Sequence, residues 1–109
     1  MRKIIITRWS DLTDQALTEG AVRSRCPSPK YRLGVYHYPP HTKVSGSARA
    51  GSCYILRGAV RFMFDHEITL RAGEVADLPD GAFSLEVVGD DRLEYIQCWE
   101  LSTQGVRDS

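Results

Sequence analysis

From residue 31 onward the sequence is a succession of short apolar segments separated by glycine, proline and aspartate turns. In the segment 31–38, Leu33, Val35 and His37 alternate with the other side chains, which is the period of two expected for a strand with two different faces. The pair Pro39-Pro40 ends this segment. Such a pattern favours an antiparallel all-β sandwich or barrel with at most one short helix near the N-terminus.

The middle of the chain contains a predicted hairpin. Residues 60–64 and 68–70 are apolar runs joined by Asp65-His66, a tight turn. By contrast, residues 44–51 are small and polar, so we expect a loop or a weakly held strand there, because nothing in the segment anchors its register. The last strand is expected from Leu93 to Leu101.

One domain is expected for a chain of 109 residues. Residues 1–30 should form a short strand, a brief helix and an irregular connector packed on the barrel. Ser10 is the expected N-cap of that helix, which would reach Leu17. The barrel should occupy residues 31–102, and residues 103–109 should be a frayed tail.

Charge and cysteine content restrict the function classes. Lysine plus arginine equals aspartate plus glutamate at 14 each; residues 1–34 hold seven basic and three acidic side chains (+4), which leaves the remainder at −4. This distribution favours a solvated basic face over a nucleic-acid site.

Three cysteines without a CxxC spacing favour a reducing cytoplasm. The sequence contains no apolar run of the ~20 residues that span a membrane, so no membrane partner is expected.

About half of the chain, PPHTKVSGSARAGSCYILRGAVRFMFDHEITLRAGEVADLPDGAFSLEVVG, resembles a small single-domain cupin. The second cupin motif, G-x5-P-x-G-x2-H-x3-N, is matched in its skeleton by Gly73, Pro79 and Gly81. Ser84 stands at its histidine position and Val88 at its asparagine position.

The first cupin motif, G-x5-H-x-H-x3,4-E-x6-G, ends at Gly58 after a "yvLxG"-like strand. Counting back places Gly51 at the metal-binding glutamate. The histidine pair then falls within 44–47 or, with a shifted loop, at Ser47 and Arg49.

The resemblance therefore implies the double-stranded β-helix, or jelly-roll barrel, of cupins with degenerate metal-binding motifs. Serine, glycine and arginine cannot replace three imidazoles and a carboxylate around a divalent ion, so we expect no metal cofactor. A rearranged metal site built on His37 and His41 is the alternative, although their spacing is not a metal signature.

Strand alternation predicts which side chains face the pocket. If Ser84 points inward as the cupin histidine does, Glu86 shares its face. A buried Glu86 would need Arg49 or Arg61 as a partner, and the alternative is a strand twisted so that Glu86 reaches solvent.

Two further positions are left open. Cys53 is either a nucleophile or a small core residue. In the last strand, Tyr95, Gln97 and Trp99 share one face and Ile96 and Cys98 the other, and which face lines the pocket is open.

The leading hypothesis is a metal-independent cupin that binds a small organic molecule, either neutral or anionic, inside the barrel. The candidate ligand-binding residues are Tyr36, Tyr38, Arg49, Cys53, Arg61, Ser84, Gln97 and Trp99. The first alternative is a metal-free isomerase, cyclase or lyase with Glu86 as general base. The second is a regulatory or protein-interaction domain whose barrel is filled by its own side chains. The resemblance also implies a homodimer, to which Tyr54 and Leu56 could contribute.

Overall fold

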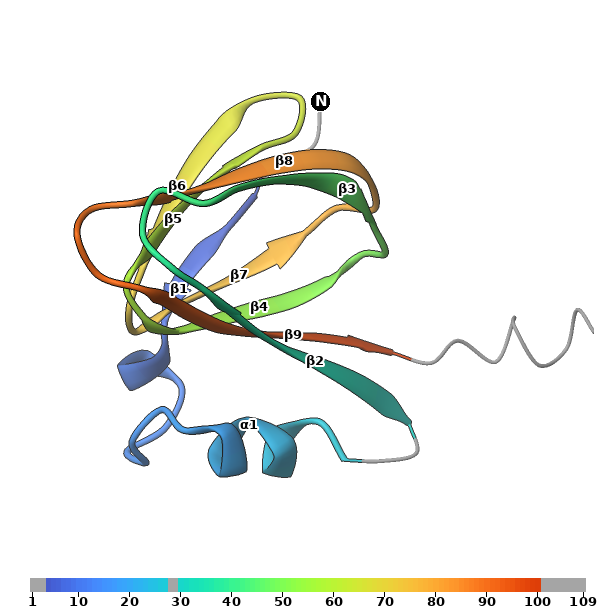
Figure 1. Cartoon of the computed structure of the whole chain (residues 1–109). Coiled ribbons are helices and arrows are strands. Elements are labelled where there is room, and N and C mark those ends of the chain that lie inside the picture. Colours follow the sequence, from blue (N-terminus) through green and yellow to red (C-terminus); the bar gives the residue numbers. More distant parts are fainter. Residues whose placement is uncertain (1–3, 28–29, 101–109) are drawn as a thin grey trace, which may run out of the picture.

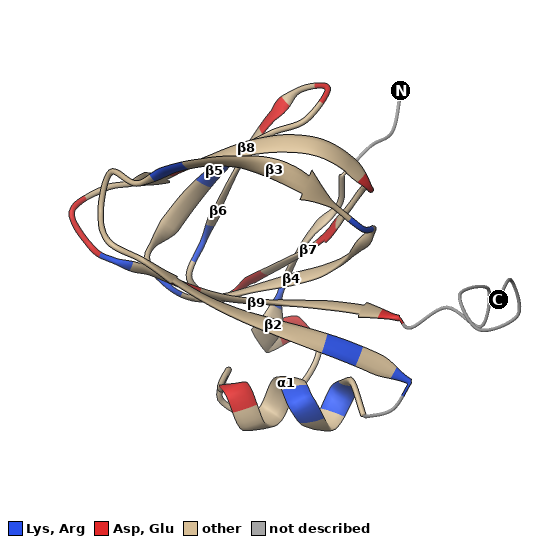
Figure 2. Ribbon diagram, turned by 45° about the vertical axis from the view of Figure 1, so that its right-hand side comes forward, with Lys and Arg blue, Asp and Glu red and all other residues tan. Residues whose placement is uncertain are grey.

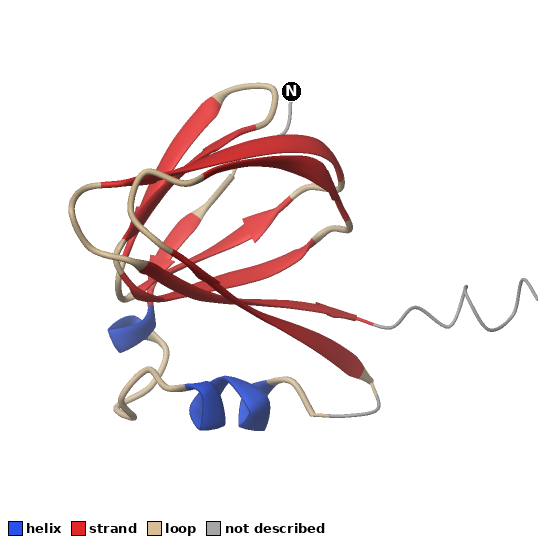
Figure 3. Cartoon of the chain, in the orientation of Figure 1, coloured by secondary structure: helices blue, strands red, loops and turns tan. Residues whose placement is uncertain are grey.

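Two antiparallel β-sheets face each other in the computed structural model, which describes residues 4–27 and 30–100 (Figures 1 and 3). The five-stranded sheet has the order β1 (Ile6–Arg8), β7 (Glu74–Leu78), β4 (Gly51–Arg57), β9 (Leu93–Glu100), β2 (Tyr31–Tyr38). The four-stranded sheet has the order β3 (Lys43–Ala48), β8 (Gly81–Val88), β5 (Ala59–Met63), β6 (Glu67–Arg71). A 3-10 turn, η1 (Trp9–Asp11), and one helix, α1 (Glu19–Arg25), precede β2.

The two sheets are not closed into a barrel within the described residues. Strands β2 and β3 follow each other in the chain, yet they are edge strands of different sheets. The expected antiparallel all-β fold with one short helix is confirmed. The two sheets are separated from each other at the edge strands β2 and β3.

The main core lies between the sheets, because alternate side chains of the inner strands point into this space. Its buried members are Cys53, Ile55, Val60, Phe62, Leu70, Ala76, Leu78, Leu85, Val87, Leu93 and Tyr95.

A second core lies between the outer face of the five-stranded sheet and the N-terminal segment, with α1 running below β2 and β9 in Figure 1. Its buried members are Trp9, Val22, Cys26, Tyr54, Val75, Ile96 and Cys98. Strands β4 and β9 are therefore apolar on both faces, as buried strands are.

The helix expected from Ser10 to Leu17 is wrong. Residues 9–11 form only the turn η1, and α1 begins at Glu19, beyond the Leu17 at which the expected helix ends. The N-cap is Thr18, whose Oγ1 accepts a hydrogen bond from the backbone N–H of Ala21 at 3.1 Å. Placing the helix after Thr18 covers the second core with Val22.

The polar segment 44–51 is more ordered than expected. Strand β3 pairs with β8 from Lys43↔Glu86 to Ala48↔Gly81. Its register is set just before the strand, because the N–H of Val87 donates to the carbonyl oxygen of Thr42 at 2.9 Å. The hairpin of β5 and β6 is confirmed, with Met63 opposite Glu67. The last strand ends at Glu100, and Leu101 lies outside the described residues.

Basic positions of α1 and of the start of β2 lie on the same side of the molecule (Figure 2). Three of these side chains have partners: Arg23 pairs with Glu19 at 2.7 Å, Lys30 with Glu100 at 3.9 Å, and Arg25 lies over the ring of Trp9. Of these three, only Arg23 and Lys30 pair with carboxylates, so the basic side chains in this part of the chain are only partly neutralised. None of the helices in the described part of the chain is long and apolar enough to cross a membrane.

Candidate ligand-binding site

A cavity of about 490 Å³ lies at the open edge of the sandwich, between β2 and β9 on one side and β3 and β8 on the other. It forms because the edge strands β2 and β3 are not hydrogen-bonded to each other. The lining residues are Arg32, Tyr36, Tyr38, Ser47, Ala48, Arg49, Phe83, Tyr95, Gln97 and Trp99.

Strand β2 supplies one wall through its alternation. Arg32, Tyr36 and Tyr38 line the cavity, whereas Val35 and His37 are exposed on the opposite face. The ring of Tyr36 folds back over Gly34, and a Cβ at residue 34 would lie 2.6 Å from the Tyr36 hydroxyl oxygen. The absence of a side chain at Gly34 therefore leaves the space that the Tyr36 ring occupies.

Strand β9 forms the floor of the cavity, and one of its two faces lines it. Tyr95, Gln97 and Trp99 line the cavity, and Ile96 and Cys98 belong to the second core under α1.

Tyr95 is directly opposite Tyr36 in the β2–β9 pair, and their rings stack with centroids 5.0 Å apart and planes 23° apart. Tyr38 lies beside them, with its plane 11° from that of Tyr36. We call Tyr36, Tyr38 and Tyr95 the tyrosine stack.

The polar groups of the site are few. Burial raises the pKa of Tyr95 far above its ordinary value, so the hydroxyl stays protonated and can donate a hydrogen bond. Gln97 is buried, and its Nε2 donates to the carbonyl oxygen of Arg49 at 3.3 Å. This hydrogen bond connects β9 to the turn between β3 and β4. It uses the backbone of Arg49, so the guanidinium group of Arg49 remains available at the cavity.

The lining contains two arginines, Arg32 and Arg49, and no carboxylate. Neither guanidinium forms an ion pair within the described part of the chain. The site is therefore an aromatic cavity with unneutralised positive charge at its mouth.

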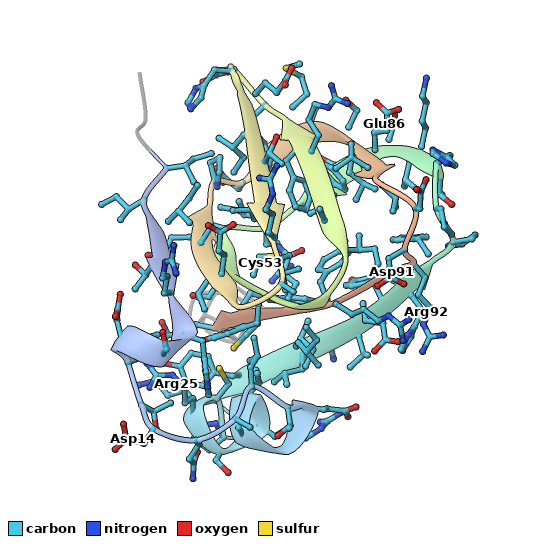
Figure 4. The ribbon with its side chains drawn as sticks, turned by 90° about the vertical axis from the view of Figure 1, so that its left-hand side faces the viewer. Asp14, Arg25, Cys53, Glu86, Asp91 and Arg92 are labelled. Atoms are coloured by element: carbon cyan, nitrogen blue, oxygen red, sulfur yellow. The ribbon has the colours of Figure 1, made fainter. Side chains whose placement is uncertain are left out.

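The expectation that Ser84 and Glu86 face the pocket is wrong. In β8 the side chains that point inward are those of Phe83, Leu85 and Val87. Burying these apolar side chains stabilises the fold, so Ser84 and Glu86 lie on the other face, although the cupin motif has an inward-pointing histidine at the position of Ser84. Glu86 lies on the outer face with 38% of its side chain exposed, the solvent-facing alternative (Figure 4).

Arg61 is on the same outer face, opposite Glu86 in the β5–β8 pair. Its Nη2 lies 3.4 Å from Glu86 Oε1, so one of the two expected partners of Glu86 is present, outside the cavity.

Cys53 lies between the sheets, fully buried in the main core, and does not line the cavity (Figure 4). Burial raises the pKa of its thiol well above the ordinary value. A thiol held protonated in an apolar core does not act as a nucleophile, so the structure supports the core interpretation.

His37 and His41 do not converge on a site. His37 is exposed on the outer side of β2, with Nδ1 4.0 Å from Glu94 Oε2, and His41 is exposed in the turn after β2 with φ +68°. Among residues 4–27 and 30–100, no group of three or more histidine, cysteine, aspartate or glutamate side chains is placed to hold a metal ion.

Sequence reasoning missed five lining residues as ligand candidates, namely Arg32, Ser47, Ala48, Phe83 and Tyr95. A signal existed for Arg32, since the period of two puts it on the same face as Tyr36 and Tyr38. Phe83 shares its row with Leu85 and Val87. Ser47 had a signal in the shifted-loop alignment, which puts it at a cupin ligand position. No signal existed for Ala48, because its contact with the cavity depends on how β3 pairs.

No protein-family model matches the chain, and no curated protein matches its sequence. Solved structures do match. The Cnp3 cupin domain of Schizosaccharomyces pombe has a TM-score of 0.60 at 14% identity, covering 75% of this chain and 60% of that one. A cupin superfamily protein of Desulfitobacterium hafniense has a TM-score of 0.57 at 14% identity, covering 92% and 79%. Salicylate 1,2-dioxygenase of Pseudoaminobacter salicylatoxidans has a TM-score of 0.60 at 12% identity, covering 73% of this chain and 22% of that one.

These matches define the class: the chain has the cupin fold, as its glycine and proline pattern predicts. It spans about 60% of the length of the Cnp3 structure. At such identities the likeness concerns the fold alone, so the function has to be argued from the cavity.

Proposed function

We propose that this protein binds a small organic molecule, without a metal ion, in the cavity between β2 and β3. The observation that carries the proposal is the convergence of the tyrosine stack, Phe83 and Trp99 with a few polar groups around about 490 Å³. Ligand pockets in proteins typically have roughly 300–1,000 Å³, apolar and aromatic walls and a small number of placed polar groups.

The donor set supports metal independence. Of the positions that match the cupin metal ligands, Gly51 has no side chain and Ser84 points away from the space between the sheets. Ser47 and Arg49 do reach the cavity, but a hydroxyl and a cationic guanidinium are poor ligands for a divalent ion. The residues present do not fit the metal of metal-dependent cupins.

The enzyme alternative loses its base, because Glu86 lies outside the cavity. The interaction-domain alternative stays a hypothesis. Side chains fill the sandwich around Val60 and Leu70, but a cavity remains between β2 and β3.

A homodimer likewise stays a prediction, although Tyr54 is now excluded from its interface. Tyr54 is buried under the N-terminal segment, 5.8 Å from the ring of Trp9. The three free, buried cysteines agree with the proposed reducing cytoplasm.

A pair of tryptophan substitutions on β3 tests the site. Ala48 lines the cavity, so Ala48→Trp should fill it, whereas Ser45 lies on the outer face, so Ser45→Trp should leave it open. We expect saturation-transfer NMR with a library of small aromatic and aliphatic compounds to detect ligands for the wild type and Ser45→Trp, and to lose them in Ala48→Trp. Thermal unfolding checks that both variants are folded.

The proposal is wrong if the compounds bind folded Ala48→Trp as well as they bind the wild type. It is also wrong if none of the library binds the wild type.

A further inference from the structure

We infer that the ligand is a planar aromatic ring bearing one anionic oxygen-acid group, a carboxylate or a phosphate, which Arg32 and Arg49 bind together. This inference rests on the proposed small-molecule site and specifies its ligand class.

The charge of the ligand follows from the two arginines. Arg23, Arg57, Arg61 and Arg92 are paired with carboxylates of the chain. Within residues 4–27 and 30–100, the two guanidinium groups that line the cavity have no carboxylate partner, and the lining offers no carboxylate of its own.

Arg32 comes from an edge strand of the five-stranded sheet, and Arg49 follows β3, an edge strand of the other sheet. A bound anion between them would be contacted from both layers of the sandwich.

The chemistry of guanidinium sets the type of anion. Its planar fork of N–H donors matches carboxylate and phosphate oxygens in a bidentate way. Both arginine side chains are exposed, so solvent screens part of the attraction and the bidentate hydrogen bonds carry the preference for an oxyanion. The protonated hydroxyl of Tyr95 adds a donor that can reach an oxygen of the ligand.

The ring follows from the tyrosine stack. Tyr36 lies nearly parallel to both of its neighbours, with planes 11° from Tyr38 and 23° from Tyr95. Such walls favour a flat, unsaturated ligand, which can stack in an offset or edge-on arrangement.

Aromatic walls alone would equally suit an organic cation, which binds over ring faces. The two guanidinium groups of the lining repel a cation, so the combination of rings and arginines selects an aromatic anion.

Matched probes test the class. We would titrate ¹⁵N-labelled protein with 2-naphthoate, 2-naphthyl phosphate and the neutral 2-naphthamide, and follow the indole N–H signals. Trp99 lines the cavity and should shift, whereas Trp9 lies buried under the sheet and serves as the internal control.

We expect one or both anions to bind at least about tenfold more tightly than 2-naphthamide, and Arg32→Gln and Arg49→Gln each to weaken the anion about tenfold, the loss of one charged hydrogen bond. Arg71→Gln removes an exposed arginine of β6 away from the cavity and should change nothing. Comparing the two anions distinguishes a carboxylate site from a phosphate site.

Equal affinity for the anions and 2-naphthamide would overturn the inference and leave the small-molecule site standing. An unchanged anion affinity in both arginine variants would also overturn it. If no naphthyl compound shifts Trp99 while other library compounds bind, the ligand class is wrong; if nothing binds at all, the proposed function itself fails.

Discussion

Replacing Gly51 by alanine should destabilise the protein, although its backbone is not left-handed. Gly51 stands where the cupin motif has its metal-binding glutamate. A Cβ there would overlap the carbonyl oxygen of Cys98 and would lie 3.0 Å from the Cβ of Trp99. These atoms belong to β9, which is held between β4 and β2, so they cannot retreat without opening a strand pair.

The magnitude can be worked from two opposing terms. A glycine-to-alanine change that fits its site stabilises by about 0.4–1 kcal/mol through the unfolded chain. Forcing an extra carbon into a packed site costs about 1–3 kcal/mol. We therefore expect Gly51→Ala to lower the free energy of unfolding by about 1–2 kcal/mol, and Gly51→Glu, which adds the same Cβ and a longer side chain, to lower it further.

Urea unfolding of the purified variant measures this loss as a lower midpoint at an unchanged slope. Gly34→Ala is the matched control, since the three atoms nearest to its Cβ all belong to the far end of the Tyr36 side chain, which can move, and we expect a smaller loss. A Gly51→Ala protein as stable as the wild type would refute the close approach of β4 to β9 at this position. It would also reopen the possibility of a carboxylate there.

Two predictions concern charge. Burial under the N-terminal segment raises the pKa of Tyr54 from 10.0 to about 12. The unfolded chain therefore ionises first, and this stabilisation is complete below about pH 10 and is lost as the pH rises toward 12. At pH 11 the free energy of unfolding should be lower by roughly 1–2 kcal/mol because of Tyr54. When urea unfolding is compared at pH 9 and 11, Tyr54→Phe should therefore lose less stability than the wild type by this amount. An identical loss in both proteins would contradict the burial of the phenol. Glu86→Gln removes an exposed ion pair with Arg61 and should change the free energy of unfolding by less than about 1 kcal/mol without affecting ligand binding, so a tenfold loss of affinity by NMR would place Glu86 back in the site.

The strands could be predicted from the sequence because each carries its own evidence. Residues 31–38 alternate and end at two prolines, and strand β2 has these bounds. Segments without such evidence were predicted less well. Strand β3 is small and polar, and it is held by its neighbour β8 and not by its own composition.

The helix was misplaced for a related reason. Ser10 and Thr18 are both plausible N-caps, and only the apolar surface of β4 and β9, which Val22 covers, selects the second.

The candidate site was half predictable, and the error has a specific origin. Tyr36, Tyr38, Arg49, Gln97 and Trp99 do line the cavity. Alternation puts Tyr36 with Tyr38 and Gln97 with Trp99, but it left open which face of the last strand lines the pocket, and Arg49 was named from the cupin motif.

Ser84 and Glu86 were placed by carrying over the orientation of the cupin histidine, although the apolar row Phe83, Leu85 and Val87 in the same strand indicates the opposite face. Where a motif has lost the residue that gave it a function, its orientation is no longer constrained by that function, and the local apolar pattern is the better guide. The meeting of Tyr36 with Tyr95 could not be predicted in either way, since it depends on β2 pairing with a strand almost 60 residues later in the chain, and it is this pairing that forms the aromatic wall of the site.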